Sequence, residues 1–187
     1  MTSAGSVDGD DRLRLFLALR FLEPDLDAVE AWSHESFSSS SVRVVPRDDL
    51  HLTLAFLGHR PARELPDIVG ALHDAASVAR DVWLRIARYR ETRSVAMLVL
   101  DDLGGGATEL AEDVQVRLEA LGVYRREGRA WLPHVTVARF RERPRLRLER
   151  PTLRTGVLIP SDAAAFLSRP APGGARYEVL ESTPLGG

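Results

Sequence analysis

The sequence predicts an α+β fold with two lobes, two mostly antiparallel sheets, flanking helices and a central cleft. Two observations lead to this prediction. Patterns typical of strand, helix, strand, strand and helix follow one another in the first part of the chain, and a looser version follows in the second. The strand pattern Leu50–Gly58 is also echoed by Pro133–Phe140, which places one copy in each part. A chain of 187 residues can bury one sizeable core, so we expect residues 12–187 to form a single bilobal domain.

The first part of the chain is expected to begin with a strand and a helix. Residues 1–11 are small, polar and acidic, which predicts a disordered tail. Arg12–Arg20 is rich in large apolar residues and predicts a buried strand. Glu23-Pro24-Asp25 is typical of a helix start, because proline fits the first turn and acids favour the positive end of the helix dipole. We expect this helix to end before the serine-rich loop 36–41.

Two strands and a second helix follow. Val42–Val45 predicts a short strand, and Leu50–Gly58 alternates polar and apolar residues as a half-buried strand does. A helix is expected from Leu65 to about Ala79, because apolar residues recur there at helical spacing.

The second part carries six further elements. A helix with its end at Gly122 is expected over Thr108–Leu121, since glycine commonly follows the last helical turn. Two antiparallel strand pairs are also expected. The first lies between the helix that ends near Ala79 and the helix that begins at Thr108, and the second lies at the C-terminal end of the chain. The predicted strands are Val82–Tyr89 with Ser94–Leu100, Pro133–Phe140 by itself, and Ala163–Ser168 with Arg176–Leu180.

Composition excludes several classes of protein. All 25 basic residues are arginines, but they are outweighed by 27 acidic residues, so any contact with nucleic acid must be local. The chain has no cysteine, which excludes disulfides, thiolate nucleophiles and zinc held by cysteine. It begins without a secretory signal and has no apolar run of the roughly 20 residues that cross a bilayer. We therefore expect a cytoplasmic protein that does not associate with membranes.

The two echoing strands each carry a histidine and a threonine on one face. Side chains alternate along a strand, so His51 and Thr53 project away from the apolar residues around them, as do His134 and Thr136. Two such strands are typical of the two walls of one polar cleft. Spacing alone also permits a structural interpretation, in which the histidines are ordinary packed residues and the threonines are present for their β propensity.

A pair of imidazoles suits acid–base catalysis at phosphorus. An imidazole has a pKa near 6.5, so one can hold a proton while the other accepts one. Neighbouring threonine hydroxyls can donate to phosphate oxygens on which charge develops. Catalytic zinc usually takes three protein ligands, and no carboxylate shares the strand face of His51 or of His134. We therefore expect neither a metal nor another cofactor.

The stretches that carry these residues resemble the paired His-x-Thr-x motifs of the 2H phosphoesterase superfamily. Their surroundings resemble its RNA 2′,3′-cyclic phosphodiesterase branch, the LigT-like or 2′-5′ RNA ligase family. The resemblance covers residues 12 to about 185, and its further matches are Arg14–Leu19, Leu50–Gly58, Pro133–Arg139 and Ser168–Leu180. It implies two lobes related by a pseudo-twofold axis. It also implies a reaction that opens a terminal 2′,3′-cyclic phosphate to a 2′-phosphate without metal and can run in reverse as 2′-5′ ligation.

The resemblance also implies roles for six residues. His51 would be the general acid toward the 3′ oxygen, and His134 would be the general base toward water, although a near-symmetric pair permits the exchange of these roles. Thr53 and Thr136 would hold phosphate oxygens. The remaining implied contacts are stacking of a base on Phe56 and binding of phosphate by Arg139.

Strict alternation places Phe56 and Arg139 on the opposite strand faces from His51 and His134, so both reach the cleft only if their strands bulge or end there. The expected partner is an RNA with a 2′,3′-cyclic phosphate end, or a small cyclic nucleotide, bound by a monomer. Two alternatives stay open: a module that binds nucleotides or RNA ends without turnover, and a phosphodiesterase for another cyclic phosphate such as an ADP-ribose derivative.

Overall fold

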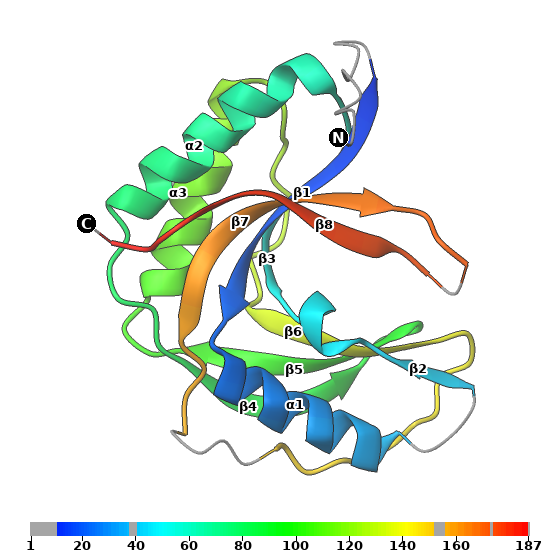
Figure 1. Ribbon diagram of the computed structural model, residues 1–187. Helices are drawn as coiled ribbons and strands as arrows, with labels where there is room; N and C mark the ends of the chain where they lie inside the picture. Colours follow the sequence, from blue (N-terminus) through cyan, green and yellow to red (C-terminus); the bar gives the residue numbers. More distant parts are fainter. Residues whose placement is uncertain (1–10, 38–40, 152–155, 173, 187) are drawn as a thin grey trace, which may run out of the picture.

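The computed structural model describes residues 11–37, 41–151, 156–172 and 174–186. The described residues form eight strands and three α-helices, with short 3₁₀ turns before and after the third strand (Figure 1). The elements are β1 (Arg12–Phe21), α1 (Glu23–Ser36), β2 (Val42–Val44), β3 (Leu52–Pro61), α2 (Leu65–Ser77), β4 (Leu84–Glu91), β5 (Val95–Asp102), α3 (Gly106–Ala120), β6 (His134–Phe140), β7 (Pro160–Arg169) and β8 (Arg176–Thr183).

The sheet confirms the predicted fold class. Every strand pair is antiparallel, and the order along the sheet is β4-β5-β6-β3-β1-β7-β8, with β2 also paired to β6. We call β3, β1, β7 and β8 the upper half and β2, β6, β5 and β4 the lower half, as they lie in Figure 1. The two predicted sheets are thus the halves of one sheet, joined where Leu52 of β3 pairs with Val135 of β6.

Each half takes strands from both parts of the chain. β2 follows α1 in sequence but pairs with β6 in the lower half, whereas β7 and β8 return from the C-terminal part to extend the upper half beside β1. The lobes are therefore not consecutive segments. This exchange of strands ties the two ends of the chain together, because neither half is complete without the other part.

The helices cover the outer side of the curled sheet. Figure 1 shows α2 and α3 side by side along the upper half, and α1 below the lower half. Apolar side chains of α2 and α3, among them Leu72 and Leu118, are fully buried against the same core as Leu52 and Leu54 of β3. Burial of each such side chain is worth about 1.5–3 kcal/mol, so the apolar faces of the two His-x-Thr strands are firmly fixed inward.

Most predicted elements are confirmed with small shifts at their ends. The largest shifts are of three residues, at the end of β3, the start of β7 and the end of β8. β3 was expected to end at Gly58 but continues to Pro61, because His59, Arg60 and Pro61 pair with the beginning of β1. The expected tail lies outside the described residues except for Asp11, so the division into tail and domain stays a prediction. None of the helices in the described ranges is long and apolar enough to cross a membrane.

Candidate active site

The pairing of Leu52 with Val135 brings the two His-x-Thr strands together. In antiparallel register the residues on either side of this pair face each other, so His51 lies across from Thr136 and Thr53 lies across from His134. Leu52 and Val135 are buried, whereas these four polar side chains are only partly buried. His51 and His134 are diagonal neighbours, a relation that places Cα atoms about 7–8 Å apart. The predicted pair of imidazoles therefore flanks one space.

Both imidazoles are held by the same local hydrogen bond. Nδ1 of His51 lies 2.7 Å from the carbonyl oxygen of Asp49, and Nδ1 of His134 lies 2.8 Å from that of Leu132. A carbonyl oxygen can only accept, so each Nδ1 carries a hydrogen and donates it. The Nε2 atom of each ring is left to accept a proton, or to donate one once the ring is charged.

Aromatic rings surround His51 on the upper half. Its ring centroid lies 4.9 Å from that of Phe16, 5.8 Å from that of Phe166 and 5.4 Å from that of Tyr177, which meets it edge-on. Phe16 and Phe166 are themselves stacked at 4.8 Å. These three residues come from β1, β7 and β8, so strands far apart in sequence together exclude water from one side of the imidazole.

This enclosure makes His51 a weak base in the free protein. Burial lowers the pKa of His51 to about 4, and the charges of Arg139 and His134 act in the same direction. The hydrogen bond to the Asp49 carbonyl opposes the shift but is outweighed. Without bound anion, His51 is therefore neutral at pH 7.

A bulge in each His-x-Thr strand decides where Phe56 and Arg139 point. Along β3 the partners of β1 skip from Thr53 to Ala55, which leaves Leu54 unpaired. Along β6 the partners of β5 skip from Thr136 to Ala138, which leaves Val137 unpaired. An extra residue reverses the alternation that follows it.

The reversal turns Phe56 and Arg139 to the same faces as the histidines. Phe56 is 49% exposed, and Arg139 is exposed between the buried residues Ala138 and Phe140. Each residue follows its histidine by five positions, so the two motifs share one irregular geometry. Under strict alternation these two residues could reach the cleft only if their strands bulged or ended there, and each strand contains a bulge.

The carbonyls of the two skipped residues have hydrogen-bond partners on neighbouring elements. Nε2 of Gln115 on α3 donates to the Leu54 carbonyl at 2.9 Å, and the backbone N–H of Val45 donates to the Val137 carbonyl at 2.9 Å. A buried carbonyl without a partner would cost about 1–3 kcal/mol. These contacts therefore stabilise the irregular strands on which the site depends.

A cavity of about 270 Å³ opens at the junction of the two halves. Of the six predicted site residues, five line it: His51, Thr53, Phe56, Thr136 and Arg139. His134 is not among the lining residues, but its charge reaches His51. Among the described residues, His, Asp and Glu side chains do not gather in groups of three that could hold a metal ion. The other lining residues are Arg14, Phe16, Arg43, Val44, Val45, Pro46, Asp49, Ser168, Ala175 and Tyr177.

Arg14 belongs to this site although sequence reasoning assigned it no role. Its Nη1 donates to Oγ of Ser168 at 2.8 Å, and its guanidinium carbon lies 4.9 Å from the centre of the Phe56 ring. A cation over an aromatic face is an attractive contact. Arg14 and Phe16 lie two residues apart in a strand pattern, so their side chains share one face of the strand. An arginine on that face was the signal in the sequence that the face has a polar function.

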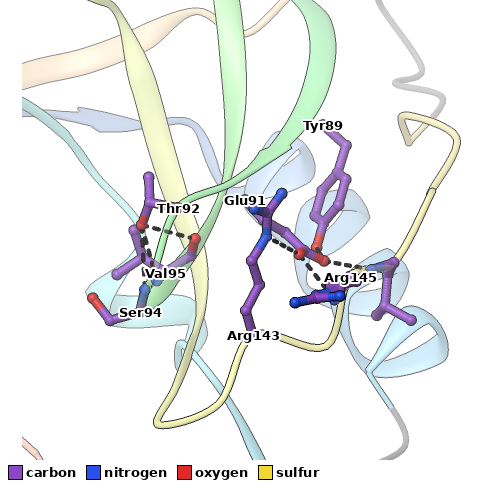
Figure 2. A network of polar contacts seen from close by, with 8 residues as sticks. Tyr89, Glu91, Thr92, Ser94, Val95, Arg143 and Arg145 are labelled. Carbon is purple, nitrogen blue, oxygen red and sulfur yellow. Dashed lines mark hydrogen bonds and ion pairs between the residues drawn. The ribbon is translucent and has the colours of Figure 1, made fainter.

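A buried carboxylate holds the chain just beyond Arg139. Figure 2 shows Glu91 at the end of β4 as the centre of a hydrogen-bond network. It accepts from the hydroxyl of Tyr89 at 2.7 Å, Nε of Arg143 at 2.9 Å, and the backbone N–H groups of Arg145 and Leu146 at 3.0 and 2.7 Å. The segment after β6 is thereby tied to β4, which fixes the strand end that carries Arg139.

One family and two known proteins match the sequence of this chain. The 2′-5′ RNA ligase superfamily matches residues 22–161 of this chain. An RNA 2′,3′-cyclic phosphodiesterase of Thermus thermophilus is 30% identical over 158 residues, which cover 76% of this chain and 75% of that protein. An RNA 2′,3′-cyclic phosphodiesterase of Methanocaldococcus jannaschii is 22% identical over 130 residues, which cover 69% of this chain and 72% of that protein.

Solved structures agree with the fold. A crystal structure of a Thermus thermophilus protein has a TM-score of 0.77 and 31% identity, and the match covers 92% of this chain and 98% of that one. The crystal structure of E. coli LigT complexed with 3′-AMP has a TM-score of 0.78 and 21% identity, covering 95% of this chain and 100% of that one. The superfamily match spans most of the chain, and the Thermus relative covers three quarters of it. This chain belongs to the 2′-5′ RNA ligase superfamily.

Proposed function

We propose that the protein is a phosphodiesterase that opens the 2′,3′-cyclic phosphate end of an RNA or nucleotide to a 2′-phosphate. The observation that carries the proposal is the arrangement across the Leu52–Val135 pair, which sets two imidazoles and two threonine hydroxyls around one space. The two relatives described as RNA 2′,3′-cyclic phosphodiesterases support the choice of substrate.

The proposed reaction is an in-line displacement at phosphorus. Nε2 of His134 accepts a proton from water as the water oxygen forms a bond to phosphorus. The bond from phosphorus to the 3′ oxygen breaks, and Nε2 of His51 donates a proton to that oxygen. The products are a 2′-phosphate and a 3′-hydroxyl. With a 5′-hydroxyl in place of water, the same steps join two ends through a 2′-5′ bond: His134 accepts the proton of the 5′-hydroxyl, its oxygen forms the bond to phosphorus, and the 3′ oxygen leaves with a proton from His51.

The general acid role of His51 requires a proton that the free site does not hold. The pKa of His51 is about 4 in the free protein, mainly because of burial. A bound cyclic phosphate carries a negative charge, and an opposite charge beside an imidazole raises its pKa. Substrate itself therefore recruits the catalytic proton, and each general acid or base is worth about 10²- to 10⁴-fold in rate.

The other lining residues are assigned to binding. The hydroxyls of Thr53 and Thr136 donate to the non-bridging phosphate oxygens, on which charge builds in the transition state. Arg139 binds a phosphate of the substrate, and the exposed ring of Phe56 offers a surface on which the terminal base stacks.

A phosphorus NMR time course tests the proposal. An oligonucleotide with a 2′,3′-cyclic phosphate end is incubated with the protein in excess EDTA. We expect the cyclic phosphate signal to be replaced by that of a 2′-phosphate. The neutral His51 of the free site favours one alternative, a module that captures cyclic ends without turnover. Saturable binding with a cyclic phosphate signal that never changes would establish that alternative and contradict the enzyme.

A further inference from the structure

Arg43 faces Arg139 at one end of the cavity. The two residues are direct partners in the antiparallel register of β2 and β6, and both are exposed and line the cavity. Like charges opposite each other on neighbouring strands repel and destabilise the pair. An anion bound between the two guanidinium groups would turn this repulsion into attraction.

Many arginines in the described ranges form ion pairs with carboxylates, whereas Arg43 and Arg139 do not. Arg47, Arg60 and Arg80, for example, each form an ion pair with an acidic residue. Neither Arg43 nor Arg139 forms an ion pair with any described residue. Asp49 lines the same cavity, and burial raises the pKa of its carboxyl more than the charge of Arg43 lowers it. The net charge at this end of the cavity is positive.

Arg43 also reaches across the opening between the halves. A Cβ atom placed on Gly174, in the connection between β7 and β8, would lie only 1.4 Å from Nη1 of Arg43. The guanidinium from the lower half thus packs directly on the backbone of the upper half. The absence of a side chain at residue 174 gives the guanidinium room at the cavity mouth.

We propose that Arg43 and Arg139 bind a second phosphate of the substrate, the one attached to the 5′ oxygen of the nucleotide that carries the cyclic end. This inference rests on the proposed function and names its substrate class as an RNA end rather than a nucleoside cyclic phosphate. Arg43 is then a specificity residue, because it contacts only substrates that have a phosphate on the 5′ oxygen.

The geometry of the terminal nucleotide fits this assignment. Its base leaves the ribose at C1′, its cyclic phosphate spans C2′ and C3′, and its 5′ phosphate leaves through C4′ and C5′. With the base on Phe56 and the cyclic phosphate between His51 and His134, the 5′ phosphate extends away from Phe56. Arg139 lies three residues beyond Thr136, but the bulge at Val137 shortens this span to two residues of the partner strand β5, or about 7 Å, which is within reach of one nucleotide and an extended arginine.

The test compares two substrates that share a terminal base. One is a nucleoside 2′,3′-cyclic phosphate, and the other is a dinucleotide that ends in the same cyclic phosphate. For each substrate, kcat/KM is measured with the wild type, with Arg43→Gln, and with Arg88→Gln as a matched control. Arg88 is an exposed arginine on β4 and does not line the cavity.

We expect the wild type to prefer the dinucleotide and Arg43→Gln to lower that preference at least tenfold. Arg88→Gln should keep the preference within twofold of the wild type. Raising the salt concentration from 50 to 200 mM should weaken the preference of the wild type and have little effect on that of Arg43→Gln. Thermal unfolding of Arg43→Gln, followed by circular dichroism, checks that the variant is folded.

Two results would overturn the inference, and they are distinguishable. If the wild type turns over both substrates and Arg43→Gln keeps the same preference, the second phosphate subsite is wrong and the proposed function stands. If the folded wild type turns over neither substrate, the proposed function fails and the subsite falls with it.

Discussion

Leu52 of β3 lies directly opposite Val135 of β6, and this buried pair joins the two halves of the sheet. His51 precedes the first of these residues and His134 precedes the second. The pair therefore sets both the union of the halves and the relative position of the two imidazoles. The apolar contact and the polar residues therefore lie on opposite faces of the same short strand segments.

Leu52→Ala should reduce stability and activity together. The variant removes a fully buried side chain, which typically costs about 2–5 kcal/mol in the free energy of unfolding. Because the cavity forms beneath His51 and Thr53, we expect kcat to fall as well, at a temperature where the protein is still folded. Urea denaturation and steady-state kinetics measure the two effects.

Leu72→Ala is the matched control for this prediction, since Leu72 is equally buried but lies on α2, away from the site. It should lose a similar amount of stability and keep its kcat. Equal kcat values for the two folded variants would show that the seam does not position the histidines.

The contribution of His51 to stability should depend on pH. Its pKa is about 4 in the folded protein and near 6.5 in the unfolded chain, so between these values the unfolded chain binds the extra proton. The contribution is fully present above about pH 6.5 and is lost as the pH falls toward 4, by about 3 kcal/mol in total. The difference in unfolding free energy between wild type and His51→Gln, measured by urea denaturation from pH 4 to 8, should follow this curve. A difference that is constant with pH would contradict the enclosed imidazole.

The threonine hydroxyls should matter in the transition state. Thr53→Val and Thr136→Val keep the shape of the side chain and remove its hydrogen-bond donor. Loss of one such donor commonly costs about 10²- to 10³-fold in kcat. Thr53→Ser and Thr136→Ser keep the hydroxyl and should retain most of the activity. Valine variants as active as the serine variants would remove the threonines from the mechanism.

Glu91→Gln should destabilise the segment after β6. The Glu91 side chain is 2% exposed, and hydrogen bonds from Tyr89, Arg143 and two backbone N–H groups lower its pKa although burial alone would raise it. The amide of a glutamine has one acceptor oxygen where the carboxylate has two. Its NH₂ group would face N–H and O–H donors of the network, which cannot accept a hydrogen bond from it. We expect a loss of about 1–3 kcal/mol in the free energy of unfolding.

Glu178→Gln provides the comparison, since Glu178 pairs with Arg169 at the surface, where such a pair is worth about 0–1 kcal/mol. Similar losses in the two variants would mean that the Glu91 network is no stronger than a surface ion pair.

The sequence predicted the regular parts of the site and missed the irregular ones. Alternation of side chains was enough to place His51 and Thr53 on one face, because the buried residues between them are clearly apolar. The bulges at Leu54 and Val137 left no local sign, since a single extra residue is visible only against its partner strand. Strict alternation therefore placed Phe56 and Arg139 on the faces opposite their histidines, and only the bulges reverse that placement.

The surroundings of His51 depend on contacts that no local pattern reveals. Phe16, Phe166 and Tyr177 lie on three different strands and meet at the imidazole only after the sheet has formed. These contacts bury the imidazole, and the burial lowers the pKa of His51. Arg43 is a similar case, because its position opposite Arg139 results from β2 crossing to the lower half.

The measurement that tests the account most directly is the hydrolysis of a 2′,3′-cyclic mononucleotide in excess EDTA by His51→Ala, His134→Ala and the double variant. Paired acid and base catalysis predicts that each single variant loses at least 10²-fold in kcat, and that the double variant is only slightly slower than the worse single variant, because groups that act as a unit are not additive. Wild-type turnover by either folded single variant would contradict it.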